Sequence, residues 1–156
     1  MKHPFSRLAI LTRGTPEAQN ERKTRKMFME KQLIYKDLTN EIIAAAISVH
    51  KELGSGFNER IYESALVEEL RLRNIPFERQ KIVDVFYRGK KVGYYKLDLI
   101  VDNTVVVELK TLNHLENFYL SQLISYLRAT RLKVGLVLNF ATPTLEIKRV
   151  INSELL

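Results

Sequence analysis

Apolar residues recur every three or four positions in two successive segments that follow residue 35. Their members are Ile42, Ala46, Val49 and Leu53 in the first segment, and Tyr62, Leu66 and Leu70 in the second. This period is typical of helices that bury one face, so we expect helices over residues 37–53 and 58–73. Gly54 can end the first helix, and Asn74 stands where the second would take a left-handed cap.

Strand-like and turn-like segments alternate in the rest of the chain. The expected elements are three strands over residues 77–86, 92–101 and 105–110, a helix over 117–130, a buried strand over 134–138 and a short last helix over 145–151. Arg88-Gly89-Lys90 and Asp102-Asn103 are typical hairpin turns between the first three strands. The order α-α-β-β-β-α-β-α predicts a single α/β (α+β) domain over residues 35–156.

The amino-terminal segment, residues 1–34, differs from the rest in charge. The chain of 156 residues has a net charge of +7, and residues 1–35 carry eight Lys or Arg against three Glu, a net charge of +5. No apolar period accompanies this charge, which favours a flexible basic tail; a basic arm that holds a phosphate backbone is the alternative. Met27 and Met29 are further candidates for the first translated residue.

Composition narrows the classes of function. The residues after 35 carry a net charge of only +2, which by itself gives no strong electrostatic footprint for DNA. The chain contains no cysteine, which excludes disulfides, zinc fingers and thiol catalysis and fits a reducing compartment. No stretch reaches the roughly 18 consecutive apolar residues of a membrane span. We therefore expect a cytoplasmic protein without a membrane partner, whose oligomeric state stays open, a homodimer included.

Two acidic residues stand inside segments that otherwise belong to the core. Asp98 is flanked by leucines, and Glu108 follows three valines and precedes Lys110 by two positions. Ionised carboxylates are costly in such a setting unless something neutralises them, and a divalent cation with oxygen ligands does so well. Glu108 and Lys110 point to the same face of a strand. A strand-end salt bridge would explain the same residues, and the pattern alone leaves both interpretations open.

Two further sets of polar residues lie on expected helices. Glu59 precedes Tyr62 and Leu66 by three and seven positions, which places it on the stripe that faces the sheet. It could add a ligand to a metal there, or it could be a favourable charge at a helix start. Gln122 and Tyr126 are one turn apart and share a face. They are either polar groups at the rim of a helix or a pair that holds a phosphate or orients Lys110.

Gly56, Glu59 and Tyr62 form a G-x-x-E-x-x-Y signature, with which the chain resembles the GxxExxY protein family. That family is assigned to the PD-(D/E)XK nuclease superfamily, whose core has the order α-β-β-β-α-β. The elements expected between residues 58 and 139 follow the same order. The resemblance implies a restriction-endonuclease-like fold with an extra amino-terminal helix and a short carboxy-terminal helix. Two departures are that Leu97 replaces the proline before the Asp and Tyr119 replaces a His found in relatives.

By this resemblance, Asp98, Glu108 and Lys110 correspond to the catalytic residues of the superfamily. The metal ligands would be Asp98, Glu108 and Glu59, which would bind one or two Mg²⁺ ions, with Mn²⁺ as a substitute. Lys110 would position or deprotonate the attacking water. The resemblance thus implies Mg²⁺-dependent hydrolysis of phosphodiester bonds in DNA or RNA, without indicating an endonuclease or an exonuclease.

The resemblance also implies residues that bind nucleic acid. Gln122 and Tyr126 correspond to the Q-x-x-x-Y motif of exonuclease branches of the superfamily, and Tyr62 is expected to join them in substrate binding. A fold does not fix a function, however. The alternative is a catalytically silent nucleic-acid-binding or protein-interaction module that retains the nuclease fold.

The shared metal site depends on the length of one hairpin loop. A two-residue turn at 102–103 would oppose Asp98 to Val107 and send the side chain of Glu108 to the other face of the sheet. A three-residue loop over 102–104 would oppose Asp98 to Glu108 on one face. The nuclease interpretation therefore predicts the three-residue loop or a bulge.

Overall fold

The computed structural model describes residues 14–156, and the chain divides into two units with a boundary between Ile34 and Tyr35. The described part of the first unit is helix α1 (Pro16–Leu33). Its start is set locally, because Thr15 Oγ1 accepts a hydrogen bond from the Ala18 N–H at 3.3 Å and Pro16 occupies the first turn. The sequence pattern did not predict this helix, since its polar residues surround it and leave no apolar stripe.

The predicted flexible tail thus contains a helix over residues 16–33, and its first 13 residues lie outside the described part. An exposed pair of i and i+4 partners, Lys26 Nζ and Glu30 Oε1 at 3.9 Å, adds little to the stability of the helix. That the tail can be removed without loss of the folded domain stays a prediction.

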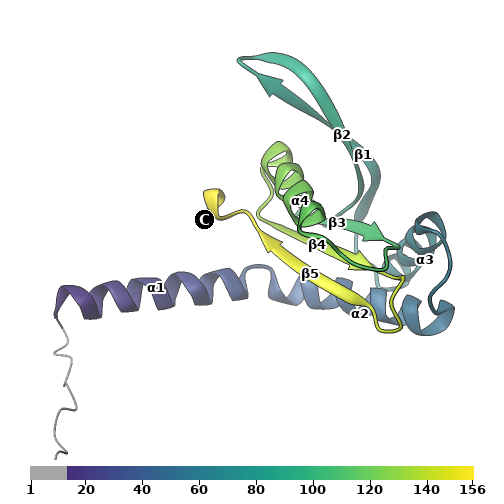
Figure 1. Cartoon of the computed structure of the whole chain (residues 1–156), viewed down its shortest axis with the longest axis horizontal. Helices are drawn as coiled ribbons and strands as arrows, with labels where there is room; N and C mark the ends of the chain where they lie inside the picture. The colour runs from purple at the N-terminus through teal and green to yellow at the C-terminus, as the bar shows by residue number, and fades with distance from the viewer. Residues whose placement is uncertain (1–13) are drawn as a thin grey trace, which may run out of the picture. The chain divides into compact units, whose positions relative to one another are not determined.

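The second unit is a mixed α and β domain with one five-stranded sheet (Figure 1). Its elements are α2 (Lys36–Leu53), α3 (Glu59–Leu72), β1 (Phe77–Tyr87), β2 (Lys90–Val101), β3 (Val105–Lys110), α4 (Asn117–Thr130), β4 (Val134–Asn139), β5 (Glu146–Ile151) and the short 3₁₀ helix η1 (Ser153–Leu155). The strand order is β1-β2-β3-β4-β5, with β3 and β4 parallel and the other neighbours antiparallel. Helix α4 supplies the crossover that a parallel pair requires.

The prediction of a last helix over residues 145–151 is wrong. Residues Glu146–Ile151 form strand β5, which pairs antiparallel with β4 from Asn139↔Glu146 to Val134↔Ile151. The three-residue spacing of Ile147 and Val150 suits a helix in isolation. In the folded domain, β4 is fully buried and its free edge needs backbone partners, so pairing overrides local preference.

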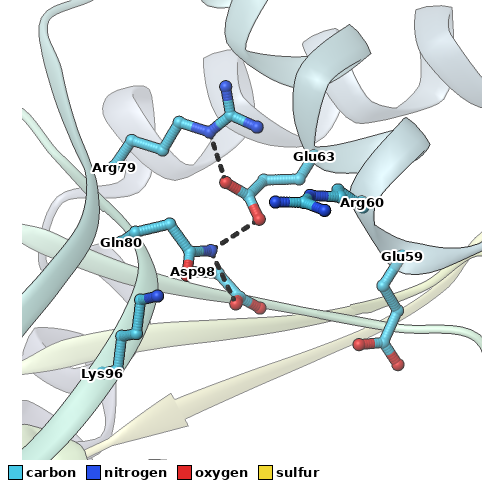
Figure 2. Close-up of a pocket in the computed structure, with 7 residues that line it drawn as sticks. All are labelled: Glu59, Arg60, Glu63, Arg79, Gln80, Lys96 and Asp98. Atoms are coloured by element: carbon cyan, nitrogen blue, oxygen red, sulfur yellow. Dashed lines mark hydrogen bonds and ion pairs between the residues drawn. The ribbon is translucent and has the colours of Figure 1, made fainter.

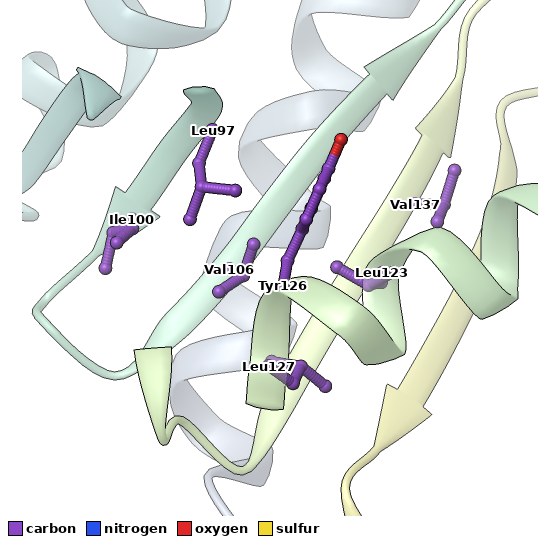
Figure 3. Close-up of a cluster of buried hydrophobic side chains, with 7 residues drawn as sticks. All are labelled: Leu97, Ile100, Val106, Leu123, Tyr126, Leu127 and Val137. Atoms are coloured by element: carbon purple, nitrogen blue, oxygen red, sulfur yellow. The ribbon is translucent and has the colours of Figure 1, made fainter. Parts of the chain in front are cut away.

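A hydrophobic cluster between α4 and the sheet fixes the helix over the strands that carry the acidic residues. Its buried members are Leu97, Ile100, Val106, Leu123, Tyr126, Leu127 and Val137 (Figure 3). Helix α4 lies very close to β4 at Gly135, where an added Cβ would stand 2.8 Å from a Leu123 methyl carbon. Behind the sheet, α3 contacts β3 and α2 packs on α3. Strands β3 and β4 are therefore buried, and the polar groups on them require an explanation.

The loop between β2 and β3 has the length that the shared site requires. Leu99 pairs with Val107 and Val101 with Val105, which leaves residues 102–104 as a three-residue loop. Asp102 and Asn103 have φ values of 49° and 50°, a left-handed conformation that Asp and Asn tolerate. The predicted register is confirmed, and its continuation opposes Asp98 to Glu108.

The regular alternation of β2 breaks at Asp98. Leu97 and Ile100 both belong to the cluster under α4, although an odd and an even position should face opposite sides of a strand. Gln80, across the ladder from Asp98, has a φ of 52°, which is strained for a residue other than glycine. The hairpin of β1 and β2 therefore twists where Asp98 lies.

Candidate metal centre

The loop before α3 is held by the first and last residues of the G-x-x-E-x-x-Y signature. Gly56 has a φ of 113°, which residues with a Cβ rarely adopt. The Tyr62 hydroxyl donates to the Gly54 carbonyl at 2.5 Å and accepts from the Phe57 N–H at 3.3 Å. Its ring stacks on Phe140 at 4.5 Å. Tyr62 is fully buried, so the structure gives it an architectural role and no surface for the predicted substrate contact.

Glu108 lies at the centre of the candidate site. It is 7% exposed, and its Oε1 accepts a hydrogen bond from Lys110 Nζ at 2.9 Å. Its second oxygen, Oε2, is the one buried side-chain nitrogen or oxygen without a hydrogen-bond partner among the described residues. Burial, and then the negative charge of Asp98, raise the pKa of Glu108 to about 7. An ionised carboxylate here lacks part of the solvation that it would have in water.

Asp98 is connected directly to the strand that carries Glu108. Its Oδ2 accepts a hydrogen bond from the Leu109 N–H at 2.9 Å. This bond links β2 to β3 just beyond Leu99, where the backbone pairing of the two strands ends. Burial raises the pKa of Asp98 above its ordinary value, against the lowering effect of this bond, and Glu63 raises it further. Two carboxylates with raised pKa values therefore share one partly apolar site.

Lys110 is held between an anion and an aromatic ring. Its ammonium lies 5.2 Å from the centre of the Tyr119 ring on α4, in addition to its bond with Glu108. Burial lowers the pKa of Lys110, but the charge of Glu108 and its hydrogen bond raise that pKa by more. A protonated lysine can contact a phosphate oxygen or orient a water molecule. Deprotonation of the water would require the neutral lysine, which the charge of Glu108 disfavours.

An unpredicted set of side chains connects Asp98 to α3 (Figure 2). Glu63 is 6% exposed, and its two oxygens accept from Arg79 Nε at 2.5 Å and from Gln80 Nε2 at 2.7 Å. The same Gln80 nitrogen lies 3.4 Å from Asp98 Oδ1. We call Glu63, Arg79 and Gln80 the clasp. Glu63 precedes the buried Leu66 and Leu70 by three and seven positions, and that spacing could have revealed it.

Glu59 does not lie where the helix period placed it. It is exposed, although Tyr62 and Leu66 on the expected stripe are fully buried. It lines a pocket of about 560 Å³ together with Asp98, Lys96 and the clasp. Within the described residues, no three His, Cys, Asp or Glu side chains are gathered as a ready metal site. Asp98 and Glu108 are thus brought together, while Glu59 stands on the pocket wall.

Gln122 and Tyr126 lie on the face of α4 that covers β3. Tyr126 is 6% exposed and meets the Tyr95 ring edge-on at 4.8 Å. Its hydroxyl points along β3 toward the end that carries Glu108 (Figure 3). Burial, then Glu108 and Asp98, raise the pKa of Tyr126 to about 12, so the phenol stays protonated. Gln122 is half-buried, and its side chain makes no hydrogen bond within the described part of the chain.

The end of β3 is fixed by a buried amide that the sequence did not reveal. Asn139 is fully buried; it accepts from the Leu112 N–H at 2.9 Å and donates to the Leu112 carbonyl at 2.8 Å. The Phe140 N–H also donates to the Lys110 carbonyl at 2.8 Å. These bonds anchor the segment that follows Lys110 to β4, so the ammonium is presented from a rigid strand end.

We compared the sequence with models of known protein families. The family model of the PD-(D/E)XK nuclease superfamily matches residues 36–150. The chain belongs to that superfamily. The mixed sheet, with Asp98 on β2 and Glu108-Leu109-Lys110 on β3, is consistent with the restriction-endonuclease-like fold of PD-(D/E)XK proteins. No curated protein matched the sequence.

Membership in the PD-(D/E)XK superfamily gives the domain a nuclease-like fold, and the narrower GxxExxY assignment stays a prediction from the signature. In the part of the chain that the structure describes, no helix combines the length and the apolar composition needed to cross a membrane.

Proposed function

We propose that this chain is a divalent-metal-dependent phosphodiesterase that hydrolyses DNA or RNA. The observation that carries the proposal is Glu108 Oε2, a buried carboxylate oxygen without a hydrogen-bond partner among the described residues. Buried polar atoms almost always have partners, and an unpartnered one calls for an explanation such as an ion. Lys110 offsets the charge of one Glu108 oxygen only.

The donor set fits a magnesium ion, with manganese as its substitute. The donors are carboxylate oxygens, which Mg²⁺ prefers, and Mg²⁺ retains several water ligands, so Asp98 and Glu108 are enough to hold it. Glu59 is proposed as a third ligand because it is exposed and lines the same pocket as Asp98. A bound divalent cation would lower the pKa of a water ligand and offset the negative charge that develops on the phosphate.

The chain's own residues have separate roles in this proposal. Lys110, protonated and held by Glu108, contacts a phosphate oxygen or orients the attacking water. Gln122 and Tyr126 are proposed to bind the substrate, because an amide without a partner and a protonated phenol can donate to phosphate oxygens. Tyr62 supports the loop that positions Glu59. The absence of cysteine fits the proposed cytoplasmic location.

A cleavage assay tests the proposal. The purified full chain is incubated with fluorescein-labelled single-stranded and double-stranded DNA and RNA, in MgCl₂, in MnCl₂ or in EDTA. We expect cleavage of at least one substrate with either metal and none in EDTA. Glu108→Gln should remove cleavage, and Glu52→Gln, which changes an exposed glutamate at the end of α2, should not.

Two results would contradict the proposal. Cleavage that persists in EDTA or in Glu108→Gln would assign the activity to another site or to a contaminant. Absence of cleavage by the wild-type chain on all four substrates, together with retained nucleic-acid binding, would support the non-catalytic alternative.

A further inference from the structure

The β1–β2 hairpin extends beyond the part of the sheet that β3 supports (Figure 1). In β2, only Leu99, Ile100 and Val101 pair with β3, so residues 90–98 lack a second strand partner. One face of this extension packs inward, where Val83 and Tyr95 contact the cluster under α4. A long two-stranded ribbon without a function is unusual, because such a ribbon is marginally stable and offers free edges.

The other face of the hairpin exposes large side chains to solvent. Ile82, Phe86 and Tyr94 are 60%, 63% and 62% exposed. On β1, Ile82, Asp84 and Phe86 alternate onto one side of the ribbon. Their partners on β2 are Lys96, Tyr94 and Lys91, the last of them beyond a register shift between Val85 and Phe86, so these side chains project from the same side. We call the surface formed by Ile82, Asp84, Phe86, Lys91, Tyr94 and Lys96 the outer face.

The positive charge of the folded domain is concentrated on the same hairpin. Residues 79–96 contain six Lys or Arg and one Asp, a net charge of +5. The other residues between 35 and 156 contain 11 Lys or Arg and 14 Asp or Glu, a net charge of −3. The small net charge of the domain is therefore the sum of a basic hairpin and an acidic remainder.

Cations and rings alternate along the hairpin. Lys91 Nζ lies 5.7 Å from the centre of the Tyr94 ring while it pairs with Asp84 at 2.7 Å. At the tip, the Arg88 guanidinium lies 5.5 Å from the centre of the Tyr87 ring. Lys96 lines the pocket that contains Asp98, so the outer face continues into the candidate metal centre.

We propose that the outer face binds a single-stranded segment of nucleic acid and leads it to the candidate metal centre. Exposed aromatic rings stack on unpaired bases, and neighbouring lysines contact the phosphates between them. A duplex hides the faces of its bases, so rings interleaved with lysines favour a single strand. The choice of nucleic acid as ligand rests on the proposed function, but binding at this surface is measured separately from cleavage.

Fluorescence anisotropy in EDTA tests the binding without cleavage. The probes are a fluorescein-labelled single-stranded oligonucleotide and the blunt duplex of the same sequence, both as DNA and as RNA. The ring-loss variant carries Phe86→Thr and Tyr94→Thr, because threonine keeps the preference for strands. The ring-swap variant, Phe86→Tyr with Tyr94→Phe, is its matched control. Leu72→Ala, the second control, removes an apolar side chain on α3 that is 71% exposed.

We expect the wild-type chain to bind the single strand at least tenfold more tightly than the duplex. The ring-loss variant should lose about tenfold in affinity for each ring removed, with an unchanged dependence on salt. The ring-swap and Leu72→Ala variants should bind like the wild type. A charge variant of the outer face, Lys91→Gln with Lys96→Gln, should reduce the slope of log affinity against log salt by about 1.4.

Several results would overturn the inference. If the wild type and the ring-loss variant bind the single strand with equal affinity, the rings of the outer face do not bind it, even if the wild type cleaves nucleic acid. Tighter binding of the duplex than of the single strand would mean that the outer face contacts a groove of double-stranded nucleic acid and not unpaired bases. Ring-dependent self-association in sedimentation would identify a second copy of the chain as the occupant. Ring-dependent binding without any cleavage would support this inference while contradicting the proposed function.

The variants must also be folded for these results to count. The substituted side chains are mostly exposed and do not belong to the cluster under α4. We therefore expect melting temperatures within a few degrees of the wild type. If the ring-loss variant unfolds, the single substitutions Phe86→Thr and Tyr94→Thr make the same test, because each should lower the affinity for the single strand by about tenfold.

Discussion

Two glutamates that interact electrostatically with Asp98 are almost equally buried and differ in how many of their oxygens have hydrogen-bond partners. Glu63 is 6% exposed and both of its oxygens have partners, whereas Glu108 is 7% exposed and only one of its oxygens has one. The first therefore resembles a structural ion pair, which is costly to break. The second leaves Oε2 without a hydrogen-bond partner, as the proposed metal site requires. Burial alone does not distinguish these two roles; the count of partners for each oxygen does.

The largest difference between the two glutamates should appear in cleavage. We expect Glu108→Gln to reduce the rate with Mg²⁺ by at least about 1,000-fold, because an amide neither attracts the cation nor offsets charge on the phosphate as well. Glu63→Gln should reduce it by about tenfold or less, because Glu63 acts on Asp98 through Gln80 and through its charge, and both of its own oxygens already have partners. Single-turnover rates at saturating metal measure both. Similar losses in the two variants would contradict the comparison.

The second difference concerns pH. The pKa of Glu108 in the folded protein is about 7, above its ordinary value of 4.5. Between pH 4.5 and 7, Glu108 is therefore mostly protonated in the folded state and mostly ionised in the unfolded state. The free energy of unfolding of the metal-free protein should therefore fall as pH rises from about 4.5 to 7, by on the order of 3 kcal/mol. The raised pKa of Asp98 acts in the same direction.

Urea unfolding in EDTA at pH values from 5 to 8 measures this slope. Glu108→Gln should remove the larger part of this slope, and Glu63→Gln should reduce only the contribution of Asp98, whose pKa the charge of Glu63 raises. Millimolar Mg²⁺ should raise stability most at the higher pH, because the cation binds the ionised carboxylates. A wild-type stability that rises between pH 5 and 7 in EDTA would show that Glu108 is not the strained carboxylate.

The third difference concerns stability at pH 8 without metal. Glu63→Gln should lower the free energy of unfolding by about 2 kcal/mol, since it weakens two hydrogen bonds of a buried carboxylate. The Arg79 side chain is 38% exposed, which limits the loss. Glu108→Gln should instead stabilise the protein. A double-mutant cycle with Arg79→Gln isolates the ion pair, and a coupling near zero would refute the structural role of Glu63.

The smallest expected effect distinguishes two changes at Gln80. Gln80→Ala loses the bonds to Glu63 and Asp98 and keeps the left-handed backbone, whereas Gln80→Gly loses the same bonds and relieves the strain of φ 52°. The glycine variant should therefore be more stable than the alanine variant by about 1 kcal/mol. Denaturant midpoints compare the two. A more stable alanine variant would mean that the left-handed conformation of residue 80 is not retained in solution.

Much of the site could be predicted from sequence because strand alternation and loop length obey simple rules. Counting residues around Asp102 showed that only a three-residue loop or a bulge would oppose Asp98 to Glu108, and the nuclease interpretation therefore selected the register that the structure has. Gln80 could not be predicted in this way, since a left-handed glutamine within a strand has no local sequence signal. It is imposed by the twist of the hairpin and by the partners that Glu63 and Asp98 offer.

The fold shows the same division between local and tertiary causes. The amphipathic helices α2 and α3 and the hairpin turn at Arg88 and Gly89 were predicted, because each depends on nearby residues. Strand β5 was missed because its conformation depends on pairing with β4. Helix α1 was missed for the opposite reason: it has a good cap but no apolar stripe to reveal it.

The three residues between Val101 and Val105 control the site by parity. Inserting or removing one residue there would shift the pairing of β2 and β3 by one step and turn the side chain of Asp98 away from Glu108, although every chemically active residue would remain in the sequence. A change of two residues would keep both carboxylates on one face. During evolution, this loop can therefore gain or lose residues only in pairs if Asp98 and Glu108 are to stay on the same face of the sheet.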